Sequence, residues 1–152
     1  MSTREAAVAG QFYPSSPDEI HAMLEHYNQI IDEHLKEKEG VLHLKPRAVI
    51  VPHAGYVYSG FTANIALRLL SNSDIKRVVI IGPSHRVYLT GTSISEFDTY
   101  HTPLGALLID KPLVLDLKER FDIGFVPEAH HEHSTEVQIP FVKTYTPDVS
   151  VV

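Results

Sequence analysis

Two short apolar runs, each leading to a histidine, constrain this chain more than any other feature. Ala48–Val51 precedes His53, and Val78–Ile81 precedes His85. Runs that lack charge and end at Pro or Gly are typical of strands buried on both faces of a parallel sheet. Between them, Phe61–Leu70 carries apolar residues on one helical stripe. The pattern predicts two neighbouring parallel strands joined by a helix. Both histidines would then lie at the edge of the sheet formed by the carboxyl ends of its strands, where the ligand sites of open α/β sheets are found.

The composition narrows the class of protein. The 152 residues suit one domain with its own core. The chain has no cysteine, which excludes disulfides and thiolate zinc sites within it. A net charge of -6 and the lack of a basic run argue against a nucleic-acid partner. No apolar run approaches the roughly 20 residues of a membrane span, and no signal-peptide pattern opens the chain. We therefore expect a cytoplasmic protein.

Helix signals are clearest near the N-terminus. Ser16 is predicted as an N-cap, with Pro17 in the first turn and Glu19 completing a capping box. An apolar stripe then runs from Ile20 to Leu35 with a 3.6-residue period. The histidines of this region are expected at the surface, away from any site, because no ligand partner stands at a suitable spacing. They are His21, His26, His34 and His43.

The second half of the chain carries weaker signals. Thr92–Ser95 and Leu107–Ile109 are strand candidates, and the residues between them (97–105) resemble a long loop. Asp110 is expected to N-cap a helix that turns Leu113, Leu117 and Phe121 inward. A further helix is expected around Val137–Tyr145, with Pro140 bending it or delaying its start. The apolar run at 148–152, without a turn or a polar tail, favours a piece of a larger domain.

Two polar stretches lie close to the predicted edge. The loop Gly55–Gly60 holds Tyr56 and Tyr58, whose phenols either donate into a cleft or pack in the core. The stretch Glu128–Glu136 is rich in histidine and carboxylate and precedes a predicted helix. Such clusters occur both at functional sites and as solvated surface loops, and spacing alone does not decide between them.

Six ordered motifs together resemble the Memo-like family, which includes the B component of the AmmeMemoRadiSam system. They are Arg4–Ala6, Gly10–Pro14, Pro52–Tyr56, Gly82–His85, Thr102–Gly105 and Glu132–Phe141. The resemblance implies a three-layer α/β/α fold with a mostly parallel or mixed sheet, similar to the LigB-type class III extradiol dioxygenases. It covers only the first half of a family member. Residues 1–152 are thus expected to form the N-terminal portion of a single Memo-like domain whose C-terminal half is missing.

The resemblance also implies a metal pocket in which His53 and His85 match two ligand histidines. The expected cofactor is a divalent metal, iron first, with copper or zinc as alternatives. His133 is the candidate catalytic base or a partner of a ligand. Glu132 or Glu136 is expected to orient a ligand imidazole. Tyr56 and Ser84 are expected at the pocket wall. The structural alternative is that His53 and His85 only cap strand ends.

Three functions remain open at this point. The first is a metal-dependent oxidoreductase of the dioxygenase type. The second is an adaptor that binds a peptide or an anion without metal. The third is a hydrolase in which zinc activates water. The ligand is a small molecule or a peptide, and no membrane or nucleic-acid partner is expected. An exposed apolar strand edge would favour a homo-oligomer.

Overall fold

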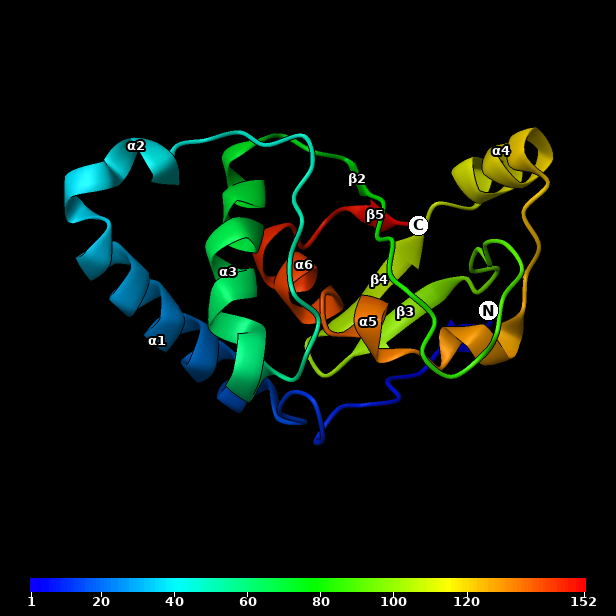
Figure 1. The fold of residues 1–152 in the computed structure, drawn as a ribbon, viewed down its shortest axis with the longest axis horizontal. Helices are drawn as coiled ribbons and strands as arrows, with labels where there is room; N and C mark the ends of the chain where they lie inside the picture. Colours follow the sequence, from blue (N-terminus) through cyan, green and yellow to red (C-terminus); the bar gives the residue numbers. More distant parts are fainter.

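The computed structural model describes residues Met1–Val152 and is an α/β protein built on a five-stranded mixed sheet (Figure 1). The strands are β1 (Thr3–Arg4), β2 (Arg77–Val78), β3 (Thr99–Thr102), β4 (Gly105–Ile109) and β5 (Ser150–Val151). Their order in the sheet is β1-β3-β4-β5-β2. Only β3 and β4 pair antiparallel, and the other neighbours run parallel. The predicted α/β class with a mixed sheet is confirmed, and the arrangement is consistent with a three-layer α/β/α fold.

Six α-helices accompany the sheet. They are α1 (Pro17–His34), α2 (Glu39–Leu42), α3 (Phe61–Leu67), α4 (Lys111–Phe121), α5 (His133–Glu136) and α6 (Ile139–Tyr145). A π-helical turn, Tyr56–Gly60, leads into α3. Figure 1 shows α1 and α3 at one end of the molecule and α4 at the other. None of these helices is both long and apolar enough to cross a bilayer.

Local sequence explains how the two longest helices begin. α4 starts where the Asp110 carboxylate accepts a hydrogen bond from Leu113 N at 3.1 Å, as predicted. α1 starts at Pro17, with Asp18 and Glu19 in its first turn facing the positive end of the helix dipole. Its predicted capping box is wrong, because the Ser16 side chain makes no cap hydrogen bond. Proline and the acidic first turn therefore suffice to define this start.

The core consists of two clusters that share the α6 region. The first joins α1 and α3 to the N-terminal segment, and it includes Val8, Leu24, Tyr56 and Phe141. The second joins the sheet to α6 and the start of α4. Its buried residues are Ile94, Tyr100, Leu107, Ile109, Val114, Ile139, Val142, Val149 and Val151. Residues of one helix thus anchor both halves of the structure.

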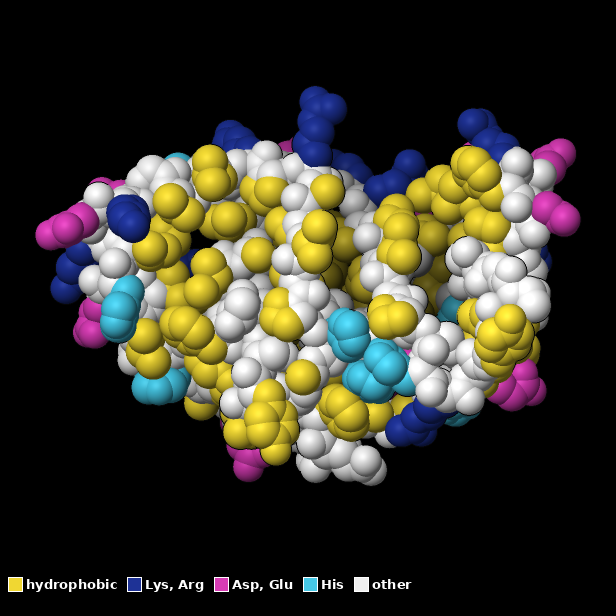
Figure 2. Space-filling view, viewed as in Figure 1, with side chains coloured by type: hydrophobic (Ala, Val, Ile, Leu, Met, Phe, Trp, Pro, Cys, Tyr) yellow, Lys and Arg dark blue, Asp and Glu magenta, His cyan; other side chains and the backbone are white.

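The two apolar runs before the histidines are buried on one face only. Val49 and Val51 pack against the first cluster, whereas Ile50 between them is fully exposed. No backbone–backbone hydrogen bond involves residues 48–51, so the strand expected there does not form. In the second run β2 is short, although Ile80 N donates to Val152 O at 2.8 Å beyond it. The expectation that both runs are buried on both faces was therefore wrong. Figure 2 shows hydrophobic side chains exposed across the side of the molecule seen in Figure 1.

Three further expectations change in the second half. Residues 97–105 are not a loop, because β3 forms there and turns tightly into β4 at Gly105, which has a positive φ of 103°. Thr92–Ser95 makes only an isolated bridge between Ser93 and Gly124. Phe121 is exposed at the end of α4, while Val114 takes the buried position on that helix.

Candidate metal centre

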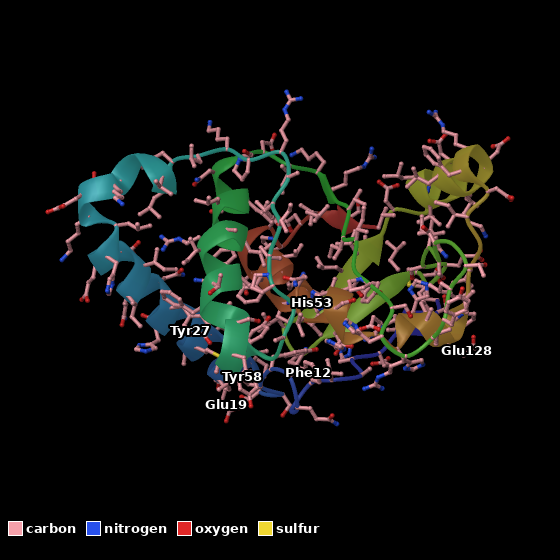
Figure 3. The ribbon with its side chains drawn as sticks, viewed as in Figure 1. Phe12, Glu19, Tyr27, His53, Tyr58 and Glu128 are labelled. Carbon is pink, nitrogen blue, oxygen red and sulfur yellow. The ribbon has the colours of Figure 1, made fainter.

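Three histidines from distant parts of the chain meet at one rim. His53 follows the extended segment 48–51, His85 follows the run after β2, and His133 is the first residue of α5. Their ring centroids are 5.2 Å apart for His53 and His85, 5.8 Å for His53 and His133, and 4.4 Å for His85 and His133. One ring nitrogen of each lies within 4.8 Å of the others. Figure 3 labels His53 near the centre of the molecule, and we call these residues the histidine triad.

Close backbone contacts hold the three segments together. A Cβ atom at Gly82 would lie 2.5 Å from Ser134 Oγ, so only glycine allows this approach. The same Ser134 hydroxyl donates to Pro83 O at 2.7 Å, which fixes the start of α5 beside the segment leading to His85. The Gln138 side chain donates to Pro52 O at 3.2 Å and holds the residue before His53. The close approach at Gly82 and the hydrogen bonds to the carbonyl groups of Pro52 and Pro83 therefore hold together the segments that carry the imidazoles.

Glu132 orients two rings of the triad. Its Oε1 accepts from Nδ1 of His85 at 2.9 Å and lies 3.0 Å from Nδ1 of His133. Its Oε2 accepts from the backbone N of His85 at 2.6 Å. A charged carboxylate can only accept, so it favours the tautomers of both histidines that carry the proton on Nδ1. Their Nε2 lone pairs are consequently free to bind a metal, which is the usual arrangement of a ligating histidine and its supporting carboxylate.

The electrostatics keep the carboxylate charged and His133 neutral. Burial by itself would raise the pKa of Glu132, but hydrogen bonds from the His85 and Ser134 backbone N–H groups outweigh it and lower the pKa to about 2. Burial lowers the pKa of His133, and the neighbouring His85 and His53 add to this against the opposing charge of Glu132. A neutral imidazole is the form that binds metal.

Two residues expected at the pocket lie in the core. Tyr56 is buried, and its hydroxyl donates to Val137 O at 2.9 Å. Glu136 is also buried, and it accepts hydrogen bonds from Arg4, from the N–H groups of Ala7 and Val8, and from the Tyr13 hydroxyl. Of the alternatives for Tyr56, packing in the core is the one observed, and of the two glutamates it is Glu132 that contacts the imidazoles. The contacts of Glu136 hold the N-terminal segment in place.

The other expected residues lie nearer the triad. Ser84 Oγ donates to Val87 O at 2.6 Å and shapes the turn that carries His85. The Phe12 ring lies 4.6 Å from the His133 ring and forms a wall. Phe12 belongs to the Gly10–Pro14 motif, but nothing in its sequence context marked it as a neighbour of the site. The surface placement predicted for His21, His26, His34 and His43 is confirmed.

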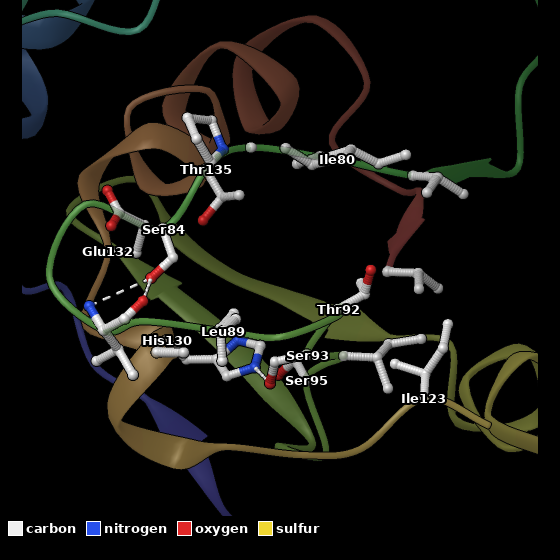
Figure 4. A pocket seen from close by; sticks show the side chains of 18 of the residues that line it. Ile80, Ser84, Leu89, Thr92, Ser93, Ser95, Ile123, His130, Glu132 and Thr135 are labelled. Atoms are coloured by element: carbon white, nitrogen blue, oxygen red, sulfur yellow. Dashed lines mark hydrogen bonds between the residues drawn. The ribbon is translucent and has the colours of Figure 1, made fainter. Parts of the chain in front are cut away.

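A cavity of about 680 Å³ has Glu132 among the residues of its wall (Figure 4). It is lined mainly by apolar residues of the segment 79–95, of α4 and of the chain end at 151–152. His130 lies in its wall, with Nε2 2.9 Å from Ser93 Oγ. Burial, with smaller contributions from Arg4 and His131, lowers the pKa of His130 to about 4. No signal in the sequence separates this histidine from the exposed His131 beside it.

Comparison with known proteins identifies the chain's relatives. A sequence profile of the family described as "Memo-like protein" matches residues 4–152. A MEMO1 family protein of Thermoplasma volcanium is 39% identical over 142 residues, which are 92% of this chain and 50% of that protein. "Protein memo-1 homolog" of Caenorhabditis elegans is 35% identical over 142 residues, 92% of this chain and 38% of that protein.

A vertebrate relative gives the same picture. "Protein MEMO1" of Danio rerio is 35% identical over 143 residues, 93% of this chain and 46% of that protein. The chain thus spans about half the length of the curated relatives it matches. Because the family profile covers nearly the whole chain and agrees with the resemblance carried by the six motifs, this protein belongs to the Memo-like family.

Proposed function

We propose that the histidine triad binds one divalent transition-metal ion. The supporting observation is the convergence of three ring nitrogens within 4.8 Å. Metal–nitrogen bonds near 2.1 Å require two ligand nitrogens to lie within about 4.2 Å of each other. The triad reaches this limit if its rings move by less than about 1 Å. A small rotation of the partly exposed His53 ring, together with a smaller adjustment of the exposed His85 ring, would supply that movement.

The donor set fits such an ion. Imidazole nitrogens suit iron, copper and zinc, and the chain offers no thiolate that would compete. Three ligands on one side leave coordination positions open toward solvent, where His85 is exposed. Glu132 favours the binding tautomer of two of the rings, and Phe12 shields His133.

The reaction class that we propose is the oxidation, by dioxygen, of a small molecule carrying two neighbouring hydroxyl groups, in the manner of extradiol dioxygenases. An iron ion with open coordination positions of this kind supplies oxygen chemistry when it is bound. In this chain His53 and His85 would hold the ion. His133 would act either as the third ligand or as the base that accepts a hydroxyl proton. Its lowered pKa keeps the ring neutral and suits both.

A second candidate is a zinc-dependent hydrolase. The observation that favours it is the position of Glu132, which contacts Nδ1 of His85 and of His133 and is not itself one of the three converging residues. Three histidines, some of which donate their second ring N–H to a carboxylate, are typical of zinc sites in which the ion activates water. A metal-free adaptor gains less support, because Tyr56 is committed to the core.

Elemental analysis tests these proposals. Protein purified without chelator should contain about one metal ion per chain. His53→Ala and His85→Ala should each lose it, whereas the control His101→Ala should keep it, since His101 is exposed and pairs with Glu5 on another part of the surface. Iron or copper supports the oxidoreductase, and zinc supports the hydrolase. A His133→Ala variant that keeps metal but loses turnover marks His133 as the base. Unchanged metal content in all variants would refute the site.

A further inference from the structure

The Arg4 guanidinium lies in the interior of the protein and donates from all three of its nitrogens. Its side chain is only 3% exposed, and its charge is paired with the buried Glu136 carboxylate. Nε donates to the His130 carbonyl at 2.8 Å, and Nη2 donates to the Glu132 carbonyl at 3.2 Å. Arg4 therefore contacts the stretch 130–136 at its first residue, near its middle and at its last residue.

This stretch carries the parts of the candidate site that come from the second half of the chain. His133 is one ring of the triad, and Oε1 of Glu132 lies 2.9 Å from Nδ1 of His85 and 3.0 Å from Nδ1 of His133. The same carboxylate accepts from the backbone N of His85 and of Ser134. Hydrogen bonds weaken steeply outside a narrow range of distance and angle, so a carboxylate with these contacts tolerates little displacement. The position of the Glu132 backbone thus decides whether both rings keep their shared acceptor.

The pattern of contacts explains why an arginine stands at position 4. Pairing with the Glu136 carboxylate alone requires one cationic group, and a lysine ammonium could supply it. Donation to the His130 and Glu132 carbonyls at the same time uses the planar fork of the guanidinium, which presents five N–H donors in a rigid array. Arg4 therefore fixes the backbone of residues 130–136 in addition to neutralising the carboxylate at their end.

The influence of Arg4 on the site is positional. None of its hydrogen bonds reaches an imidazole of the triad. The pKa values of Glu132 and His133 are shifted by burial, by hydrogen bonds and by charged side chains of the site, and Arg4 is not among these groups. An effect of Arg4 on the triad is consequently transmitted through the backbone that it holds.

We propose that Arg4 is a positioning residue of the histidine triad. By fixing the backbone at Glu132, it places the carboxylate that orients the rings of His85 and His133. Strand β1, at the edge of the sheet, thereby determines the alignment of two imidazoles that it does not touch. The consequence for metal affinity rests on the proposed function, whereas the consequence for the ring tautomers does not.

Arg4→Lys tests the proposal, because it keeps a cation beside Glu136 and removes the fork. The double variant Arg4→Met/Glu136→Gln is made in parallel. It removes both charges together, so that neither is left buried alone, and the glutamine still offers an acceptor oxygen. The matched control is Ile31→Ala, which opens a cavity under α1. Ile31 is buried but belongs to neither core cluster, so this variant is destabilised without any change near the site.

The first measurement is nitrogen NMR of metal-free protein with isotope-labelled histidine, which reports the tautomer of each ring. In the unmodified chain, His85 and His133 should carry the proton on Nδ1. Arg4→Lys and the double variant should each convert at least one of these rings to a mixture of tautomers. Ile31→Ala should leave both unchanged.

The second measurement is the dissociation constant of Co²⁺, followed by the visible absorption of the bound ion. Under the proposed function the unmodified chain binds Co²⁺. Arg4→Lys should weaken this binding about tenfold, as is usual when a group that supports the ligands is lost, and should shift the absorption bands. Ile31→Ala should bind Co²⁺ as the unmodified chain does.

Unchanged tautomers in both Arg4 variants would overturn the positioning role, and so would equal changes in the Ile31→Ala control. Unchanged Co²⁺ affinity of Arg4→Lys in a chain that binds Co²⁺ would also overturn it. If the unmodified chain binds no Co²⁺, the proposed metal function fails. The NMR comparison still decides the role of Arg4 in that case, because it is made without metal.

Discussion

At the scale of single residues, Glu132 links the two imidazoles that come from different segments. One oxygen faces Nδ1 of both His85 and His133, and the other oxygen accepts from the His85 backbone. Each of these contacts needs an acceptor, so the carboxylate cannot be replaced by an amide without turning an N–H group toward a donor. The residue is therefore expected to control metal affinity without being a ligand.

Glu132→Gln should lower metal affinity by about 10- to 100-fold, the usual cost of losing a carboxylate behind a ligand histidine. Competition against a chromophoric chelator measures this change. Glu128→Gln is the control, because Glu128 is exposed and lies earlier in the same stretch of chain (labelled in Figure 3). Equal affinities of the two variants would contradict the orienting role.

His130 makes a separate prediction about pH. Its pKa is lowered to about 4 in the folded chain by burial, with smaller contributions from Arg4 and His131, against an ordinary value of 6.5. Between these values the unfolded chain binds a proton that the folded chain does not. The free energy of unfolding should therefore fall as pH drops from 7 to 5, and this group adds no further loss below pH 4.

The expected contribution of His130 is about 1 kcal/mol by pH 5, after allowing for the water that still reaches the ring. Urea unfolding at several pH values in the presence of chelator measures it. His130→Gln, which keeps a donor or acceptor near Ser93, should flatten the pH dependence. The exposed control His21→Gln should not. Identical slopes in both variants would show that His130 is not the group responsible.

At the scale of elements, the short α5 holds the N-terminal segment through Glu136. This buried carboxylate pairs with the buried Arg4 and accepts N–H groups of Ala7 and Val8 as well as the Tyr13 hydroxyl. The same short stretch of chain carries the histidine and carboxylate of the candidate site. One loop-and-helix unit thus connects strand β1, the first core cluster and the triad.

Glu136→Ala should lower the free energy of unfolding by about 3–5 kcal/mol, because it leaves the Arg4 charge buried without a partner. The control Asp116→Ala removes an exposed pair with Arg120 on α4 and should cost about 0.5 kcal/mol or less. Urea denaturation of both variants provides the comparison. A loss in the Glu136 variant as small as in the control would mean that the network does not anchor the segment.

The elements that could be predicted from the sequence are those whose signals are local. α1 and α4 follow from proline, acidic residues and the Asp110 cap at their starts, and β4 follows from its apolar run. β3 was missed because Thr99–Thr102 lacks branched apolar residues and is stabilised by its pairing with β4. The motifs predict the meeting of His53 and His85 at one rim. The positions of Phe12 and His130 depend on long-range packing, which no local pattern encodes.

At the scale of the whole molecule, several aliphatic side chains in and beside the sheet are exposed to water, although their sequence pattern is that of a core. Aliphatic residues that look like core in the sequence contribute nothing to the stability of this chain where their side chains meet water. Ile81 and Ile109 show the contrast, because the first is exposed and the second is buried against the second cluster.

Ile81→Lys should change the free energy of unfolding by no more than about 0.5 kcal/mol, as expected for a surface site. Ile109→Ala should lower it by about 2–4 kcal/mol, because it opens a hole in packed structure. Chemical denaturation of the two variants side by side measures the difference. Strong destabilisation by the lysine at position 81 would show that this side chain is already covered in solution.

Metal binding by the three histidines would also affect how long the polypeptide resists proteolysis. Long stretches of chain separate His53 from His85, and His85 from His133. A single ion bound to all three would act as a cross-link that closes two long loops at once. Its binding free energy would add directly to the stability of the folded state. The unfolded chain does not hold the three histidines together and would bind the ion weakly. The metal concentration would therefore shift the equilibrium between folded and unfolded forms by mass action. The half-life of this protein under proteolysis would then lengthen as the concentration of the free ion rises.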